Sequence, residues 1–345
     1  MGTRSDPHGS GRPRPGAVIY PAMPALDVLR MAQHVEDTGY STVWIGDSQN
    51  QWREAMTLLG AVAATTERII VGTGVTNPVT RHLAVSASTW ATLRELSGGR
   101  AVAGIGTGFT ALGAIGLRGA RLSRLQSTIA DLRTLLSGGS VLDAPTGARF
   151  GIDYLTDRPV SVPVYVAASG PKALATAGRI ADGVILLTGT APEFVAEALS
   201  HVERGAAEAH RTLADIDVVL WVEGSIDDDP VAARDRVRGP VARSVMRWLP
   251  MTLPESIKPA VARLREHAGE YDGTYIGHKV AKPEHVALTG DDIVDAFALA
   301  GTPGEIADRV ATYGDLGVDQ VAVIPAYGAT LDEQLTILDK FARCF

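Results

Sequence analysis

The fold class is decided by one stretch of the sequence, Pro163-Val-Tyr-Val-Ala-Ala-Ser-Gly-Pro-Lys-Ala-Leu-Ala-Thr-Ala-Gly-Arg-Ile-Ala-Asp-Gly-Val-Ile-Leu-Leu187. It begins with a short apolar run at 163–168, continues with a segment of helical periodicity at 171–180, and returns to an apolar run at 183–187. Short apolar runs bounded by turn residues are typical of buried strands. The stretch therefore predicts a strand, a connecting helix and a second strand.

The same alternation extends over most of the chain. Further strands are expected at 17–20, 42–45, 68–76, 101–105, 216–222 and 320–324, with amphipathic helices between them. Eight strands that alternate with helices predict an α/β fold of the (β/α)8 TIM-barrel type, formed by one domain over residues 17–345. A doubly wound sheet shares this alternation, but its Gly-x-Gly-x-x-Gly fingerprint is absent after the first strand.

Three segments depart from the alternation. Residues 1–16 are rich in Gly, Pro, Arg and Ser, and we expect a disordered tail there rather than a signal peptide. Residues 138–160 are rich in turn residues, and residues 226–300 contain no expected strand and resemble two or three helices with loops. Both of these segments are expected to be insertions into the barrel.

Composition excludes several classes of protein. The chain has 345 residues, of which 46% are hydrophobic, and a net charge of −7. A hydrophobic fraction of this size excludes general disorder, and no apolar run is long enough to span a membrane. The acidic balance argues against nucleic-acid binding, and the single cysteine, Cys344, can form neither an internal disulfide nor a cysteine metal cage. We expect a cytoplasmic protein with a small-molecule substrate.

Two expected strands end in loops suited to an anion. In a barrel the chemistry lies at the carboxyl ends of the strands. Thr107 and Gly108 follow the strand at 101–105, and Ser169, Gly170 and Pro171 follow the strand at 163–168. Serine suits a helix N-cap and proline the first turn, and the free amides of such a helix attract a phosphate. The two loops predict a shared phosphate site, with simple turns and helix capping as the alternative.

Two other strand ends carry features of interest. Asp47 follows the strand at 42–45 and lies near Trp52 in the sequence, so it could hydrogen-bond a cofactor ring or a substrate; the alternative is a surface turn. Gly74 and Val75 fall inside the expected third strand, where a glycine often marks a bulge. A bulge would aim the backbone toward the barrel mouth, whereas the alternative is a plain strand end that turns at Asn77.

The sequence lacks the residue patterns of several reactions that are common in barrel enzymes. The histidines do not cluster as metal ligands, none of the lysines falls in an expected strand, and no Gly-x-Ser-x-Gly elbow is present. A pair of strand-end carboxylates is also missing. A phosphate cradle with few acid–base groups and no metal site remains, which favours a cofactor whose own ring carries out the chemistry.

Several segments together resemble a known family. They are Gly72-Thr-Gly-Val-Thr-Asn-Pro-Val-Thr-Arg-His82, Thr92-Leu-Arg-Glu-Leu-Ser-Gly-Gly-Arg100, Gly104-Ile-Gly-Thr-Gly108, residues 167–183 and residues 301–310. They are similar to the bacterial luciferase-like superfamily, and most to its branch that uses the deazaflavin coenzyme F420, such as methylenetetrahydromethanopterin reductases and F420-dependent glucose-6-phosphate dehydrogenases. The resemblance implies an enzyme with an insertion-bearing barrel, usually a homodimer.

The resemblance also implies which residues bind the cofactor. It assigns the cofactor phosphate to the loops after the fourth and fifth strands, and it implies a non-prolyl cis peptide at Gly74–Val75 behind the deazaflavin ring. The implied cofactor-binding residues are Asp47, Gly74, Val75, Thr76, Asn77, Thr107, Gly108, Phe109, Ser169, Gly170 and Pro171.

The implied catalytic positions differ from those of the sugar-phosphate dehydrogenases. In those enzymes an Asp-His pair follows the second strand, with a tryptophan four residues after the histidine. The matching residues here are Asp47, Ser48 and Trp52, so serine replaces the histidine, and Phe109 stands where a carboxylate is expected. The resemblance therefore implies a more apolar pocket and a substrate other than a sugar phosphate.

The leading functional hypothesis is hydride transfer between C5 of the deazaflavin and an organic substrate. Asp47 is expected to orient the ring or to donate a proton through Ser48, and His82, Tyr275 and His278 are further candidate donors. One alternative is an FMN-dependent luciferase-like monooxygenase, which uses reduced flavin and oxygen and needs a flavin reductase partner. A second is a non-catalytic flavin- or deazaflavin-binding protein.

The helix expected at 54–66 is apolar around most of its circumference, which favours a homodimer.

Overall fold

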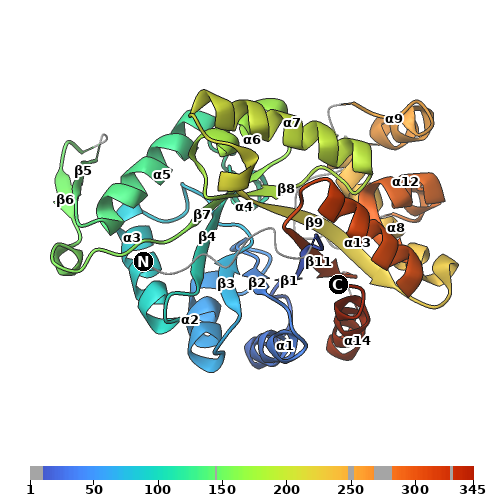
Figure 1. The fold of residues 1–345 in the computed structure, drawn as a ribbon, viewed down its shortest axis with the longest axis horizontal. Helices are drawn as coiled ribbons and strands as arrows, with labels where there is room; N and C mark the ends of the chain where they lie inside the picture. Colours follow the sequence, from blue (N-terminus) through green and yellow to red (C-terminus); the bar gives the residue numbers. More distant parts are fainter. Residues whose placement is uncertain (1–10, 144–145, 248–251, 268–281, 327–328) are drawn as a thin grey trace.

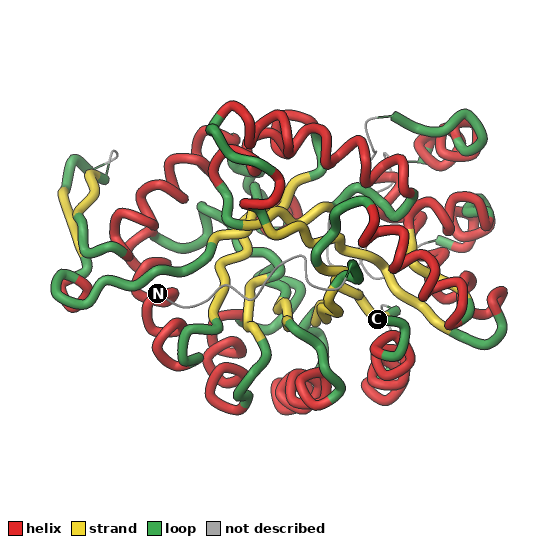
Figure 2. The backbone as a smooth tube through the Cα atoms, viewed as in Figure 1, coloured by secondary structure: helices red, strands yellow, loops and turns green. Residues whose placement is uncertain are grey.

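The computed structural model describes residues 11–143, 146–247, 252–267, 282–326 and 329–345. Parallel strands form a closed barrel, and helices surround it (Figure 1, Figure 2). The eight barrel strands are β1 (Arg14–Ile19), β2 (Thr42–Ile45), β3 (Ile70–Thr73), β4 (Ala101–Ile105), β7 (Val164–Ala168), β8 (Gly183–Leu186), β9 (Asp217–Ile226) and β11 (Gln320–Pro325). β8 pairs with β9, β9 with β11 and β11 with β1, which closes the ring. The expected (β/α)8 barrel is confirmed.

Eight helices cover the outside of the barrel. They are α1 (Ala25–Asp37), α2 (Ala55–Thr65), α3 (Leu83–Leu96), α5 (Leu122–Leu136), α6 (Pro171–Ile180), α7 (Pro192–Glu208), α13 (Pro303–Asp315) and α14 (Leu331–Ala342). α13 begins at a capping box, in which Thr302 and Glu305 each accept a hydrogen bond from the other's backbone N–H. α6 and α7 approach closely because Gly205 has no side chain: a Cβ there would lie 1.8 Å from the carbonyl oxygen of Ala175.

The core has two layers because barrel strands direct alternate side chains inward and outward. The inner layer fills the barrel with side chains that include Val18, Trp44, Ile185, Val219 and Trp221. The outer layer lies between the strands and the surrounding helices and contains most of the buried apolar residues. The barrel is therefore packed along its axis, and a ligand can enter only at its ends.

The N-terminal segment and the first insertion differ from expectation. β1 begins at Arg14 and pairs with β11, so residues 14–16 belong to the barrel and not to the tail. The expected disorder of residues 1–10 lies outside the described residues. Within 138–160 the chain forms a short antiparallel hairpin, β5 (Ser140–Leu142) and β6 (Arg149–Gly151), which projects beside α5 (Figure 1).

The described part of the second insertion contains more helices than expected, and also a strand. The four described helices are α8 (Pro230–Arg247), α9 (Lys258–Glu266), α11 (Pro283–Ala287) and α12 (Asp291–Phe297). α8, α9 and α12 pack in one apolar cluster, which also includes Ala191 and Phe194 at the start of α7. The expectation of no strand was wrong, because β10 (Ala298–Gly301) pairs in parallel with residues 223–226 of β9. Ala-Leu-Ala-Gly has little intrinsic strand preference, so its pairing with β9 decides its conformation.

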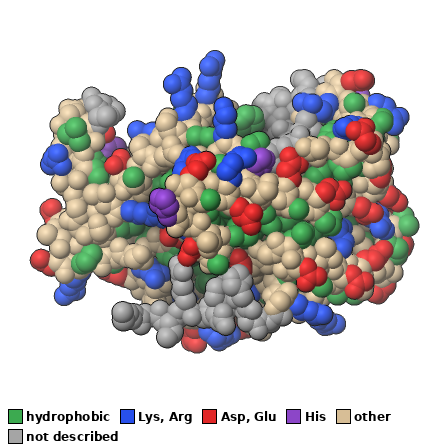
Figure 3. All heavy atoms as spheres, turned by 45° about the horizontal axis from the view of Figure 1, so that its top comes forward, with side chains coloured by type: hydrophobic (Ala, Val, Ile, Leu, Met, Phe, Trp, Pro, Cys, Tyr) green, Lys and Arg blue, Asp and Glu red, His purple; other side chains and the backbone are tan. Residues whose placement is uncertain are grey.

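The described surface is mixed in character. On the face shown in Figure 3, acidic and basic side chains are interspersed, with apolar side chains scattered between them. Large apolar side chains that stay exposed include Leu26 on α1 and Val85 and Leu96 on α3. None of the described helices is long and apolar enough to cross a membrane.

Candidate active site

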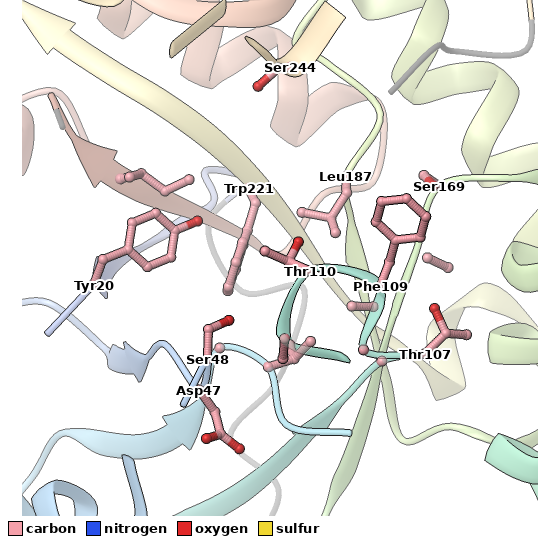
Figure 4. A pocket seen from close by; sticks show the side chains of 18 of the residues that line it. Tyr20, Asp47, Ser48, Thr107, Phe109, Thr110, Ser169, Leu187, Trp221 and Ser244 are labelled. Carbon is pink, nitrogen blue, oxygen red and sulfur yellow. The ribbon is translucent and has the colours of Figure 1, made fainter. Parts of the chain in front are cut away.

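A cavity of about 310 Å³ opens at the carboxyl ends of the barrel strands, with α8 over one side (Figure 4). This is the end of the barrel at which the sequence predicts the chemistry. The cavity brings together nine of the expected site residues, namely Asp47, Ser48, Trp52, Gly74, Val75, Thr107, Gly108, Phe109 and Ser169. The other four, Thr76, Asn77, Gly170 and Pro171, do not line it.

A bulge at the end of β3 forms part of the cavity wall. β3 and β4 are paired at Gly72 and Val102, and the pairing resumes at Thr76 and Ile105, so β3 carries one extra residue. The peptide bond between the two bulged residues, Gly74–Val75, is cis. Both the bulge and the cis peptide expected at this position are present.

Two glycines allow the bulge to pack tightly. A Cβ on Gly74 would lie 2.8 Å from the ring of Trp221, so the bulged backbone lies directly against that indole. A Cβ on Gly106 would lie 2.9 Å from a methyl group of Val75. Any larger residue at either position would displace the bulge or the indole, so the shape of this wall depends on both glycines.

Asp47 is held in a buried ion pair. Its two carboxylate oxygens accept hydrogen bonds from Arg81, with Nη1–Oδ2 at 2.5 Å and Nη2–Oδ1 at 3.2 Å. Arg81 also pairs with Glu54. Burial lowers the pKa of Arg81, but the hydrogen bonds to both carboxylates raise it above its ordinary value.

In Figure 4 the Ser48 side chain points toward Trp221 and the Asp47 side chain points the opposite way. The proton-donor role expected of Asp47 stays a prediction.

Trp52 forms an aromatic wall with Tyr20. The two rings stack with centroids 4.4 Å apart and an interplanar angle of 7°. Gly46 makes room for them, since a Cβ there would lie 2.8 Å from the Trp52 ring and 2.9 Å from the Tyr20 ring. The stack gives this side of the cavity the apolar character that the resemblance implies.

α6 begins at Pro171 as expected, but its N-cap is not the expected residue. Gly170 is the N-cap, with Pro171 in the first turn, and no described side chain caps the helix. The expectation that Ser169 caps α6 was therefore wrong; Ser169 instead lines the cavity. Because the first-turn amides receive no side-chain cap, the end of α6 keeps the positive character that attracts an anion.

The loop after β4 ends in a helix that sequence reasoning missed, α4 (Phe109–Gly113). Its N-cap is Gly108, whose φ of +75° is a left-handed conformation that suits glycine. A Cβ on Gly108 would also lie 2.6 Å from Asn77. Phe109 is the first residue of α4 and is 59% exposed at the cavity mouth.

Several other expected residues have structural contacts away from the cavity. The Asn77 side-chain oxygen accepts hydrogen bonds from the amides of Val79 and Thr80, each at 3.0 Å, and so stabilises a turn. The hydroxyl of Thr76 accepts from Arg81 at 3.3 Å. His82 caps α3 and does not line the cavity. Two candidate donors, Tyr275 and His278, lie outside the described residues.

The cavity gathers buried polar atoms that have no hydrogen-bond partner among the described residues. They are Nε2 of Gln51, Nε1 of Trp52, Oγ1 of Thr188, Nε1 of Trp221 and Oε2 of Glu223. Buried polar groups without partners are uncommon, because leaving one unsatisfied costs free energy. Their convergence on one cavity fits a ligand with polar groups along the edge of an otherwise apolar body.

Glu223 was missed in the sequence. β9 extends four residues beyond the expected end at 222, so Glu223 lies in the strand and lines the cavity. The cavity thus contains a second carboxyl group besides Asp47, one that the sequence analysis did not name. Burial raises the pKa of Glu223 to about 7, and the positive charge of Arg243 on α8 partly offsets this effect. A carboxylate at the end of an apolar strand is the signal that identified Asp47, and the same signal is present at Glu223.

Comparisons with a family model, with relatives in sequence and with a solved structure all find the same family. A family model described as luciferase-like monooxygenase matches residues 4–320. A 5,10-methylenetetrahydromethanopterin reductase of Methanolobus tindarius is 32% identical over 332 residues, 94% of this chain and 98% of that protein. An F420-dependent glucose-6-phosphate dehydrogenase of Beutenbergia cavernae is 38% identical over 334 residues, 92% and 91% of the two chains. The structure of the coenzyme F420-dependent tetrahydromethanopterin reductase from Methanopyrus kandleri superposes with a TM-score of 0.77 at 27% identity and covers 95% of this chain and 97% of that one.

Proposed function

Because the chain belongs to the luciferase-like monooxygenase family, we propose that it is an oxidoreductase that uses the deazaflavin coenzyme F420 to exchange a hydride with an organic small molecule. One observation carries this proposal: similarity over more than nine-tenths of both chains to proteins whose names state dependence on F420. When bound, the deazaflavin supplies a two-electron hydride donor or acceptor.

The residues of the cavity fit such a cofactor. The cis bulge at Gly74–Val75 would contact the ring, and the unpaired polar atoms of Gln51 and Thr188 would meet its polar edges. Thr107, Gly108 and the uncapped start of α6 would hold the phosphate. The protein's own contribution is then to hold donor and acceptor carbons at about 3–3.5 Å, to exclude water and to supply a proton.

Equilibrium binding tests the proposal. Purified protein is titrated with oxidised coenzyme F420 and, separately, with oxidised and reduced FMN, and fluorescence quenching is followed. We expect tight binding of F420 and weak binding of both forms of FMN. Preference for reduced FMN would instead favour oxygen insertion with a flavin reductase partner, the alternative hypothesis. Binding of F420 without turnover of any carbonyl compound or alcohol would favour a non-catalytic binding protein.

A pair of variants tests the phosphate site. Ser169→Asp places a negative charge beside the start of α6, whereas Ser169→Ala changes only the hydroxyl. Like charges a few ångströms apart in a partly buried site cost on the order of 1–4 kcal/mol. We expect Ser169→Asp to weaken F420 binding about tenfold or more, with a smaller effect at high salt, and Ser169→Ala to change it little. Equal affinities of the two variants would contradict the assignment.

We also propose that the protein is a homodimer through the outer face of α2. On this helix Leu58, Leu59 and Val62 are buried against the barrel, whereas Ala64 stays exposed in the single chain. Sedimentation velocity should detect a dimer that Ala64→Glu dissociates, and a wild-type monomer at every concentration would refute the proposed dimer.

The single cysteine is in keeping with a cytoplasmic location, which cell fractionation tests.

A further inference from the structure

Glu223 faces the interior of the barrel. Val219 and Trp221, at the two preceding alternate positions of β9, belong to the cluster that fills the barrel. The next residue, Gly224, faces outward, since a Cβ there would lie 3.2 Å from Phe341 on the covering helix α14. Successive side chains of a strand point to opposite faces, so Glu223 points inward, one layer above Trp221 and into the cavity.

One oxygen of the Glu223 carboxyl group has no protein partner in the described part of the chain. This atom, Oε2, is shielded from solvent and has no hydrogen-bond partner among the described residues. The neighbouring strands, β10 and β11, contain no titratable side chain, and α14 covers the opposite face of β9. α8 supplies Arg243, whose positive charge acts on Glu223. Burial keeps the proton on this carboxyl group up to about neutral pH, and Arg243 stabilises the carboxylate that remains when the proton leaves.

The other polar residues of the cavity are less suited to proton exchange. Both oxygens of Asp47 already accept hydrogen bonds from Arg81. Ser48 and Thr188 contribute hydroxyl groups, which do not ionise in the physiological range. Among the described residues that line the cavity, none is a histidine, a cysteine or a lysine. Glu223 is thus the lining side chain whose two protonation states are both populated near pH 7.

We propose that Glu223 exchanges a proton with the heteroatom bonded to the carbon that exchanges the hydride, and that the substrate is a ketone, aldehyde or imine, or the corresponding alcohol or amine. This inference rests on the proposed function, since the deazaflavin is the two-electron carrier. In the reducing direction the carbon of the C=O or C=N group gains a hydride, and its π electron pair moves to the heteroatom. The heteroatom takes the proton from Oε2 of Glu223, which leaves a carboxylate near Arg243. In the oxidising direction each of these transfers is reversed.

The first test needs neither cofactor nor substrate. Infrared difference spectra of the ligand-free protein are recorded against pH for the wild type, for Glu223→Gln and for Glu203→Gln, a matched change at an exposed position on α7. We expect a protonated carboxylic acid band that disappears near pH 7 in the wild type and in Glu203→Gln and is absent from Glu223→Gln. Absence of the band from the wild type, or its persistence in Glu223→Gln, would overturn the proposal.

The second test separates this inference from the proposed function. Oxidation of reduced F420 is followed with a panel of ketones, aldehydes and imines that includes cyclohexanone and benzaldehyde. For a panel member that is reduced, we expect Glu223→Gln to lower kcat at least 100-fold while F420 affinity and the activity of Glu203→Gln stay unchanged. A loss below threefold would overturn the role of Glu223. F420 binding without reduction of any panel member would overturn the substrate class, and absence of F420 binding would refute the proposed function itself.

Discussion

The ion pair between Arg81 and Asp47 allows a quantitative prediction about stability. The Asp47 side chain is 2% exposed and that of Arg81 is 15% exposed, whereas Glu54, the second partner of Arg81, is 50% exposed. Arg81→Met removes the cation and leaves the Asp47 carboxylate buried without its counter-charge. Breaking a buried pair in this way costs about 3–5 kcal/mol, since the desolvation of the remaining charge is no longer compensated.

The expected shift in melting temperature follows from the chain length. At about 2.1 cal/mol/K per residue, unfolding of 345 residues has an entropy of about 0.7 kcal/mol/K, so a loss of 3 kcal/mol lowers Tm by about 4 °C. Glu54→Gln removes only the exposed partner and should cost less than about 1 kcal/mol. The double variant Asp47→Asn/Arg81→Met removes both buried charges and should recover most of the loss.

Urea unfolding followed by tryptophan fluorescence, with calorimetry to check for a single transition, gives the free energies of unfolding for all four proteins. The reasoning would be refuted if Arg81→Met cost no more than Glu54→Gln. It would also be refuted if the double variant were no more stable than Arg81→Met alone, because the penalty would then not come from an uncompensated Asp47 charge.

The other predictions concern stability as well. The pKa of Glu223 is about 7 in the folded protein against an ordinary value of 4.5, so its stabilising contribution is complete below pH 4.5 and is lost as the pH rises to 7. At about 1.4 kcal/mol for each pH unit, the wild type should lose about 3 kcal/mol relative to Glu223→Gln over this interval, and parallel pH–stability curves from urea unfolding would contradict this. Gly205→Ala should destabilise the protein by about 1–3 kcal/mol, since its Cβ would lie 1.8 Å from the oxygen of Ala175. The matched change Gly60→Ala, which meets no atom within 4 Å, should stabilise the protein by about 0.5–1 kcal/mol, and equal effects of the two substitutions would argue against close contact between α6 and α7.

The parts of the fold that depend on local pattern could be predicted from the sequence. Strands such as Ala101–Ile105 and Gly183–Leu186 are continuous apolar runs because both of their faces are buried, and such runs are visible in a single sequence. The bulge at Gly74–Val75 was also predictable, since glycine in a strand interior is unfavourable without a structural reason.

The parts that depend on contacts between distant segments could not be predicted. β10 is a strand because residues 298–301 lie beside residues 223–226, and Arg81 holds Asp47 from 34 positions away in the sequence. Glu223 was missed for a related reason: its strand was predicted to end at Val222, and the extension to Ile226 depends on pairing with β10 and, at residues 223 and 224, with β11. Ser169 has the chemistry of a helix cap, but the N-cap of α6 is Gly170.

The pairing of β10 with β9 has a consequence for protein engineering. Cα partners in this ladder include Glu223 with Ala298 and Ile226 with Gly301, so the second insertion joins the sheet beside Glu223, which lines the cavity. The insertion thus contributes a strand to the barrel wall, and an exchange of the whole insertion between homologues would also replace β10. A chimera that swaps residues 227–297 alone would keep both strands of this ladder, whereas one whose boundary lies after 301 would replace β10. Splice points for altering substrate preference therefore belong before Ala298.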